Sequence, residues 1–290
     1  MLDRGHEERL SSLFRASSPI RWQRVTRGYT PVERWIVSLS DGRSLFLKIA
    51  TVPWTAQALR AEYRVYSQLH AGFLPRMLWW DDDGEKPILA LEDLSNAIWP
   101  PPWTPDRIEG VLDMLAAVHA ARIADVPTLP DIDARENWQK VGAEPGPFLS
   151  FGLCTSHWLN QELPKLVAAE ASAPLEGDDL LHVDVRSDNI CFVEGRALLI
   201  DWNLACYGNG DFDVAAWLPS LEAEGGPPPE SLLPHAPELA AHLSGYFASH
   251  AGLVVLPDDS DRRNIQLDQL KTALPWAIRA LGLPPLDGHL

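Results

Sequence analysis

Polar residues able to hold a metal ion and act on a hydroxyl group are concentrated between residues 182 and 201. An apolar run typical of a strand leads into a loop and contains His182 and Asp184 near its end. Asn189 follows five residues after Asp184, and Asp201 ends another apolar run twelve residues later. Three oxygen-bearing side chains can thus converge on one point, and Mg²⁺ prefers such ligands together with phosphate oxygens and waters. The pattern predicts that Asn189 and Asp201 hold Mg²⁺ while Asp184 acts on a hydroxyl group.

A second pair of charged residues lies in the N-terminal third of the chain. Lys48 stands inside a run of bulky apolar residues that is expected to be a strand. Glu62 shares one face of the following helix with apolar residues at helical spacing. A buried ammonium or carboxylate is costly unless it is paired, so each of these residues accounts for the other. The alternative is that Lys48 extends to solvent and Glu62 lies at the edge of the apolar stripe.

The first third of the chain is expected to be rich in strands. Asp41-Gly42 between two alternating runs is the strongest short-range signal for a hairpin. The expected elements are a hairpin of Trp35–Ser40 and Arg43–Ile49, a helix from the N-cap Thr55 to about His70, and strands Met77–Trp80 and Ile88–Leu91. Residues 81–86 join the last two strands, and we interpret them as a solvated turn rather than a metal site.

The remainder of the chain is expected to be mainly helical. Three consecutive prolines between Trp99 and Trp103 indicate a stiff linker between two lobes. Thr104-Pro105 then begins a helix with an apolar stripe. Further helices are expected near 147–170, 211–224, 236–250 and 262–282, with one short β element formed by Leu180–Val185, Ile190–Val193 and Arg196–Ile200.

Composition excludes several classes of function. The chain has 290 residues, of which 24 are Lys or Arg and 40 are Asp or Glu, giving a net charge of −16. This charge argues against nucleic acid as a partner, because binding to phosphate backbones needs a basic surface. The three cysteines form no Cys-x-x-Cys pair, no apolar run could cross a bilayer, and the charged N-terminus is unlike a signal peptide. We therefore expect a cytoplasmic protein without a membrane partner, and its oligomeric state stays open.

The loop residues resemble those of a known family. The order His182-x-Asp184-x-x-x-x-Asn189, a hairpin, and Ile200-Asp201-Trp202 looks like the catalytic and metal-binding loops of protein kinases. It is more similar to the aminoglycoside phosphotransferase family of small-molecule kinases, which has Ile-Asp-Trp where protein kinases have Asp-Phe-Gly. That family's downstream Asp-Leu-Ala corresponds to Asp213-Val214-Ala215. The resemblance extends from about Gly28 to Trp217.

The resemblance implies an α+β, bilobal protein-kinase-like fold with two domains. Residues 1–93 would form a small β-rich nucleotide-binding lobe, and residues 94–290 a larger, mainly helical lobe for catalysis and substrate binding. The implied cofactors are ATP, with GTP not excluded, and Mg²⁺. Lys48, oriented by Glu62, would reach the α/β-phosphates of the nucleotide. Gly28 would cover the phosphates, although a plain turn explains it equally well, and the backbone of Glu92 and Leu94 would bind adenine.

The same resemblance assigns roles around the reacting hydroxyl group. Asp184 would be the catalytic base, because kinase-type transfer gives that role to the aspartate. His182 and Asp213 would support the loop structurally, although His182 could also compete as the base. Arg186 departs from the family pattern. We hypothesise that it contacts the transferring γ-phosphoryl group, and the alternative is a surface salt bridge.

The implied reaction is transfer of the γ-phosphoryl group of ATP to a hydroxyl of a small molecule. An aminoglycoside-type acceptor ranks first, and the alternatives are a sugar, a choline-like alcohol, a hydroxy amino acid, or a nucleotide-binding module without catalysis. A cationic acceptor would be attracted by an acidic second lobe, although solvated faces explain the acidic residues equally well. The candidate residues for that surface are Glu222, Glu224, Asp258, Asp259 and Asp261.

Overall fold

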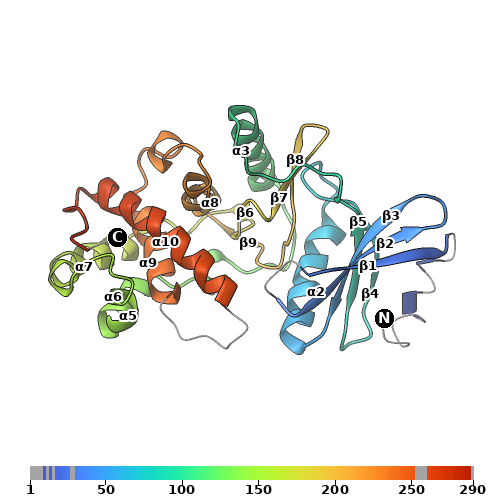
Figure 1. Ribbon diagram of the computed structural model, residues 1–290, viewed down its shortest axis with the longest axis horizontal. Helices are drawn as coiled ribbons and strands as arrows, with labels where there is room; N and C mark the ends of the chain where they lie inside the picture. The colour runs from blue at the N-terminus through green and yellow to red at the C-terminus, as the bar shows by residue number, and fades with distance from the viewer. Residues whose placement is uncertain (1–8, 11–12, 15–16, 27–29, 252–259, 289–290) are drawn as a thin grey trace. The chain divides into compact units, whose positions relative to one another are not determined.

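The structure is a computed structural model that describes residues 9–10, 13–14, 17–26, 30–251 and 260–288 (Figure 1). The chain divides into two compact units. The first contains Met1–Trp99 and Cys191–Ala205, and the second contains Pro100–Ile190 and Cys206–Leu290. The boundary expected between residues 93 and 94 treats each lobe as one continuous segment, whereas the first unit also takes in residues 191–205 from the later part of the chain.

The first unit is built on a five-stranded antiparallel sheet with strand order β1-β2-β3-β5-β4. The strands are β1 (Pro19–Val25), β2 (Val32–Leu39), β3 (Ser44–Ala50), β4 (Met77–Asp81) and β5 (Ile88–Glu92). The hairpin predicted at Asp41-Gly42 is confirmed, because β2 and β3 pair directly on either side of it. Gly42 has φ +85°, a left-handed conformation that glycine adopts without steric cost.

Helix α2 (Pro53–Gln68) contacts β3, β4 and β5, and Figure 1 shows it running along one face of the sheet. The prediction that Thr55 is its N-cap was wrong. The N-cap is Val52, and Pro53 occupies the first turn, where a missing N–H costs no hydrogen bond. Thr55 lies one turn inside the helix. Its hydroxyl oxygen accepts the backbone N–H of Thr51 and of Val52, so it still caps the helix start.

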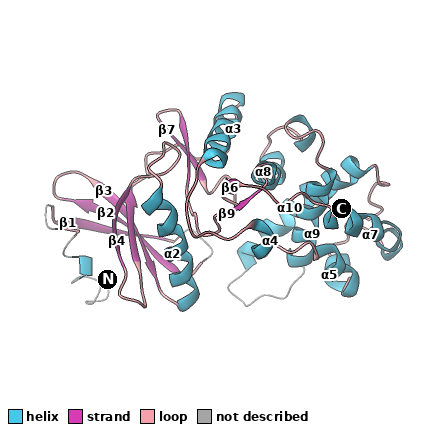
Figure 2. Cartoon of the chain, turned by 180° about the vertical axis from the view of Figure 1, so that it is seen from behind, coloured by secondary structure: helices cyan, strands magenta, loops and turns pink. Residues whose placement is uncertain are grey.

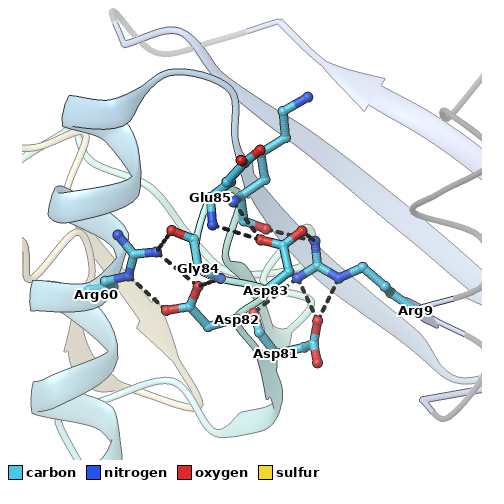
Figure 3. Close-up of polar contacts among 8 residues, drawn as sticks. Arg9, Arg60, Asp81, Asp82, Asp83, Gly84 and Glu85 are labelled. Carbon is cyan, nitrogen blue, oxygen red and sulfur yellow. Dashed lines mark hydrogen bonds and ion pairs between the residues drawn. The ribbon is translucent and has the colours of Figure 1, made fainter.

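The turn at residues 81–86 is held by two arginines that come from different elements (Figure 3). Arg9 pairs with Asp81 at 2.5 Å and with Asp83 at 2.6 Å. Arg60, on α2, pairs with Asp82 at 2.7 Å. Because each of these carboxylates already pairs with an arginine, the arrangement favours the interpretation as a turn. No group of three or more metal-ligating His, Cys, Asp or Glu residues occurs in the part of the chain that is described.

A hairpin of β7 (Ile190–Val193) and β8 (Arg196–Leu199) carries the later segment of the first unit. Phe192 forms a bridge with Ile98, and the Leu199 N–H donates to the Phe73 carbonyl at 2.8 Å. The indole of Trp202 is fully buried and packs on Phe73 with ring centroids 5.8 Å apart. These contacts fix the segment that ends at Trp202 within the first unit.

The second unit is mainly helical, as expected (Figure 2). Helices α9 and α10 make extensive contacts, and α5 and α7 also pack on α9. The helices are α3 (Pro105–Ala120), α4 (Leu129–Ile132), α5 (Asn137–Ala143), α6 (Gly146–Leu149), α7 (Ser156–Ala171), α8 (Asp211–Ala223), the 3₁₀ helix η1 (Pro229–Ser231), α9 (Pro237–Ala251) and α10 (Ser260–Leu281). None of the described helices combines the length and apolarity that crossing a membrane requires.

Two predictions for this unit need correction. The single helix expected near 147–170 is two helices, α6 and α7. The chain turns between them at Gly152, where φ is +71°, and the Thr155 side chain then caps α7. The strand expected over Leu180–Val185 is shorter, because β6 (Asp179–Leu181) ends before the loop begins. It pairs with β9 (Cys206–Gly208) in a separate two-stranded sheet.

Candidate functional site

Lys48 and Glu62 form a buried ion pair in the first unit. Lys48 lies on β3, between β2 and β5, and is 4% exposed. The apolar stripe of α2 turns Glu62 toward the sheet, where it is 2% exposed. The Lys48 Nζ donates to both carboxylate oxygens of Glu62 at 2.8 Å. The pair expected from the sequence is therefore present, and the alternative in which Lys48 extends to solvent is wrong.

Asp201 joins this pair from the segment that follows β8. Its Oδ1 accepts a hydrogen bond from the Lys48 Nζ at 2.5 Å, and its side chain is 41% exposed. Asp201 has φ +70°, a left-handed conformation that aspartate tolerates better than most residues. The neighbouring Trp202 anchors this turn, because its indole N–H donates to the Leu199 carbonyl at 2.8 Å. One lysine thus contacts one fully buried and one accessible carboxylate.

Burial and charge act in opposite directions on this cluster. Burial alone would lower the pKa of Lys48, but the charges of Asp201 and Glu62 outweigh it and raise that pKa. Burial raises the pKa of Glu62, and the nearby Lys48 ammonium only partly offsets this effect. Lys48 is therefore a permanent cation with a fixed position. Such a group can contact phosphate oxygens without being reorganised.

In the second unit, Asp213 holds the loop that follows β6. Asp213 lies in the first turn of α8 and is fully buried. Its carboxylate accepts the backbone N–H of His182 at 2.8 Å and of Val183 at 2.7 Å. His119, at the end of α3, approaches the same carboxylate at 3.3 Å. Val183 has φ +75°, which is strained for a β-branched residue, so the two bonds hold a backbone conformation that would otherwise relax.

Asp184 and Asn189 are joined within this loop. The Asn189 amide nitrogen donates to the Asp184 carbonyl at 2.8 Å and to its carboxylate at 3.0 Å. Asn189 is 4% exposed, whereas the Asp184 side chain is 39% exposed. The bonds use the nitrogen of the Asn189 amide, so its oxygen is the atom that remains to bind a cation. The loop therefore combines an accessible carboxylate with an oriented amide oxygen.

Arg186 lies between two carboxylates of the same loop. Its Nε is 3.2 Å from Asp184 Oδ1, and its terminal nitrogen is 2.8 Å from Asp188 Oδ2. The salt bridge considered as an alternative from the sequence is therefore present, and the contact with a phosphoryl group stays a prediction. His182 is fully buried, and its Nδ1 accepts the Asp184 N–H at 3.3 Å. This position favours a supporting role for His182 over one as the base.

The two residues expected to bind a nucleotide base lie at the end of β5 and just after it. The Glu92 N–H donates to the Arg76 carbonyl, and the Glu92 carboxylate accepts from the Arg76 side chain at 2.9 Å. The Leu94 carbonyl accepts the Ala97 N–H, whereas the Leu94 N–H makes no hydrogen bond with any described residue. Leu94 therefore offers a main-chain donor. The prediction for Gly28 lies outside the described residues.

The sequence indicated Glu224 only as part of an acidic surface, and the contacts through which it holds the loop were not predicted. Ser187 donates from its hydroxyl to Glu224, at the end of α8, and the Trp103 indole N–H donates to the same carboxylate at 2.7 Å. His119, which contacts Asp213, was also missed. These partners are 37, 121 and 94 residues apart along the chain, and no local pattern relates them.

The sequence offered four more acidic residues for the same surface. Glu222 is paired with Arg279 at 3.8 Å. Asp258 and Asp259 lie outside the described residues, and the side chain of Asp261 is not described.

The sequence and the fold are similar to those of known proteins. A sequence profile of the phosphotransferase enzyme family matches residues 21–278. No match was found among the curated proteins. Among solved structures, a choline/ethanolamine kinase family protein from Mesorhizobium loti is similar with a TM-score of 0.60 and 15% identity, over 96% of this chain and 98% of that one.

Two further solved structures are similar over nearly the whole chain. An aminoglycoside-3'-phosphotransferase of type VIII has a TM-score of 0.50 and 18% identity, over 93% of this chain and 100% of that one. An amicoumacin kinase in complex with AMP-PNP, Ca²⁺ and Ami has a TM-score of 0.54 and 11% identity, over 98% of this chain and 96% of that one. At these identities the likeness establishes the fold, and the expected α+β, protein-kinase-like class is confirmed. The profile covers most of the sequence, and the chain therefore belongs to the phosphotransferase enzyme family.

Proposed function

We propose that this phosphotransferase moves the γ-phosphoryl group of ATP to a hydroxyl group of a small molecule, with Mg²⁺ as its metal ion. The single observation that carries the proposal is the buried Lys48–Glu62 pair with Asp201 on the same ammonium. A lysine fixed by a buried glutamate is suited to binding phosphate oxygens, and the family match independently indicates phosphoryl transfer. GTP stays open as the phosphoryl donor.

On the nucleotide side, Lys48 would bind the α/β-phosphates and Glu62 would keep its ammonium in place. The Leu94 N–H, with the backbone of Glu92, would bind the adenine ring. Gly28 would cover the phosphates. The support for these assignments is the fixed ammonium and the Leu94 donor. A net charge of −16 opposes a polyanion, so local cations must supply the attraction.

Asn189 and Asp201 would hold Mg²⁺, and their donor atoms fit that ion. The Asn189 oxygen and the accessible Asp201 carboxylate are hard oxygen donors, and they leave other positions for phosphate oxygens and waters. Asn189 immediately precedes β7 and Asp201 closely follows β8, so a single hairpin joins the two ligands along the chain. When bound, the ion supplies positive charge that offsets the charge of the phosphates.

Asp184 would orient the acceptor hydroxyl and take its proton. The acceptor oxygen forms a bond to the γ-phosphorus, the bond from that phosphorus to the β–γ bridging oxygen breaks, and ADP leaves with that oxygen. Because the transition state of phosphoryl transfer is loose, orientation matters more than base strength. Arg186 would leave its carboxylate partners to contact the γ-phosphoryl group, while His182 and Asp213 keep the loop in shape.

For the acceptor we rank an aminoglycoside-type polyamine first, followed by a sugar, a choline-like alcohol or a hydroxy amino acid. The net charge favours a cationic acceptor, and the named similar structures include an aminoglycoside phosphotransferase and a choline/ethanolamine kinase family protein. We place the reaction in the cytoplasm. Nucleoside triphosphates are available there, and the three cysteines, all buried and unpaired, fit a reducing compartment.

The test is mass spectrometry of a mixed panel of aminoglycosides and small alcohols after incubation with ATP and Mg²⁺. The proposal expects one acceptor to gain the mass of one phosphoryl group. A thermal-shift measurement with ATP, with and without Mg²⁺, accompanies it. Stabilisation by ATP without a phosphorylated product or ADP release across the panel would favour a nucleotide-binding module instead and would contradict the proposal.

A further inference from the structure

Tyr66 buries a hydroxyl group that has no hydrogen-bond partner among the residues that the structure describes. It lies on α2 and is 2% exposed. A buried polar group without a partner costs free energy, and phenylalanine would fill nearly the same space without that cost. Because nearly all buried polar groups in folded proteins are bonded, the Tyr66 hydroxyl calls for a partner that the nucleotide-free chain does not give it.

The Tyr66 side chain shares a face of α2 with Glu62. The two residues are four apart in the helix, and both are 2% exposed. Aromatic side chains in a helix point back toward its N-terminus, so the Tyr66 ring is directed toward the turn that contains Glu62. Burial raises the pKa of Tyr66 well above its ordinary value, and the charges of Glu62 and Asp201 raise it further. The hydroxyl therefore keeps its proton and can act as a hydrogen-bond donor.

The three ammonium hydrogens of Lys48 are all used in the structure. Two go to the two carboxylate oxygens of Glu62, and the third goes to Asp201. A lysine ammonium has no fourth hydrogen to donate. In the proposed function Lys48 binds an oxygen of the α-phosphate and an oxygen of the β-phosphate. Two of its three present bonds must then be given up.

One of these two bonds has to come from Glu62. Asp201 can release Lys48, because its accessible carboxylate is also a proposed ligand of the metal ion. The second bond leaves one oxygen of Glu62 without a donor, in a place that is 2% exposed. Among the described residues, Lys48 alone donates to this carboxylate. Arg34, which pairs with Lys48 in the register of β2 and β3, donates to oxygens at the start of β2 instead.

We propose that the Tyr66 hydroxyl donates to the Glu62 oxygen that Lys48 releases when it binds the phosphates of a nucleotide. Tyr66 is then a positioning residue, which acts on the nucleotide through Glu62 and Lys48. The inference rests on the proposed function and adds a residue to its nucleotide side. The hydroxyl should matter for ADP and ATP but not for AMP, because a single phosphate needs only the hydrogen that Asp201 releases.

The test compares the wild type with Tyr66→Phe and Tyr63→Phe. Tyr63 is the matched control, because it loses the same hydroxyl from the same helix while its ring can keep its stack on Trp80, where the centroids are 4.2 Å apart. Calorimetry in the presence of Mg²⁺ measures the Kd of ADP and of AMP for each protein, so that no phosphoryl transfer is involved. Urea unfolding of the nucleotide-free proteins measures the effect of the hydroxyl on stability.

Tyr66→Phe should bind ADP about tenfold more weakly than the wild type and should bind AMP within about twofold of it. Its urea midpoint should equal or exceed that of the wild type, because the substitution removes a buried polar group and breaks no hydrogen bond. Tyr63→Phe should keep both affinities within about twofold. In protein labelled with ¹³C at the tyrosine Cζ atoms, the NMR signal that Tyr66→Phe removes should shift more with ADP than with AMP.

Different failures identify different errors. An unchanged ADP affinity in Tyr66→Phe would overturn the proposal. An equal loss for ADP and AMP would also overturn it, because the substitution would then disturb nucleotide binding as a whole. A urea midpoint below that of the wild type would show that the hydroxyl is already bonded without nucleotide, for example to a buried water, and would overturn it as well. A wild type that binds neither ADP nor ATP would instead refute the proposed function.

Discussion

Replacement of Asp213 by asparagine tests how the second unit shapes the loop of Asp184. Asp213 is fully buried, and its two carboxylate oxygens accept the N–H groups of His182 and Val183. An asparagine side chain at this position would offer one acceptor oxygen and would turn an amide NH₂ toward the other N–H. The substitution thus removes one bond and leaves a buried donor facing another donor.

The size of the effect follows from these contacts. A hydrogen bond to a charged group contributes about 1.5–3 kcal/mol, and a buried polar group without a partner costs about 1–3 kcal/mol. Relaxation of the left-handed Val183 would recover about 1–3 kcal/mol of strain. We therefore expect Asp213→Asn to lower the free energy of unfolding by about 2–4 kcal/mol. We also expect kcat to fall at least about a hundredfold, because Val183 directly precedes Asp184.

Urea unfolding and steady-state kinetics check this prediction. The control is Asp211→Asn, which changes the charge in the same first turn of α8 at an exposed residue. The control should cost no more than about 1 kcal/mol, through the helix dipole, and should keep kcat. A variant Asp213→Asn with wild-type stability and wild-type kcat would refute the reasoning.

Three further predictions address the first unit and the thiols. Glu62→Gln should destabilise the protein by about 3 kcal/mol and raise the KM for ATP, because it breaks a buried pair and frees Lys48; unchanged urea unfolding and unchanged ATP kinetics would contradict this. The hydrogen bond from Arg60 lowers the pKa of Asp82 in the folded protein below its ordinary value of 3.8. The pair therefore stabilises the protein fully at a pH above 3.8, and this stabilisation is lost as the pH falls through the lowered pKa of the folded state. Asp82→Asn should accordingly cost up to about 1 kcal/mol at pH 7, and urea unfolding should show this cost shrinking below pH 3.8. Burial raises the pKa values of the three cysteines to about 11 or 12, so mass spectrometry should find no iodoacetamide adduct at pH 8 unless urea is added.

Local patterns placed Lys48 in a strand and Glu62 on the apolar face of the following helix, and the resemblance of the later loop to kinase loops then favoured their pairing over the solvent-exposed alternative. The Asp41-Gly42 turn fixes the register of β2 and β3, and the apolar stripe of α2 then leaves Glu62 on the face that meets the sheet. Both signals act over a few residues, so the sequence carries them directly. Strand β1 was not predicted, because its mostly exposed residues lack the alternation that marks a half-buried strand.

The parts of the site that sequence could not predict depend on contacts between distant residues. Glu224 was one acidic residue among several until Ser187 and Trp103 were seen to share its carboxylate. The start of α2 was predicted wrongly for a different, local reason. A threonine before a helical run indicates an N-cap, but Pro53 allowed the helix to begin earlier, and Thr55 became its third residue.

The most direct test of the account follows the γ-phosphate itself. ATP labelled with ¹⁸O in its γ-phosphate is incubated with the protein, Mg²⁺ and the acceptor that the panel identifies, and the product is weighed by mass spectrometry. We predict that the acceptor gains one labelled phosphoryl group with the wild type, and that Asp184→Asn, at unchanged thermal stability, forms it at least about a hundredfold more slowly. Appearance of the label only in free phosphate, or full transfer by Asp184→Asn, would contradict the account.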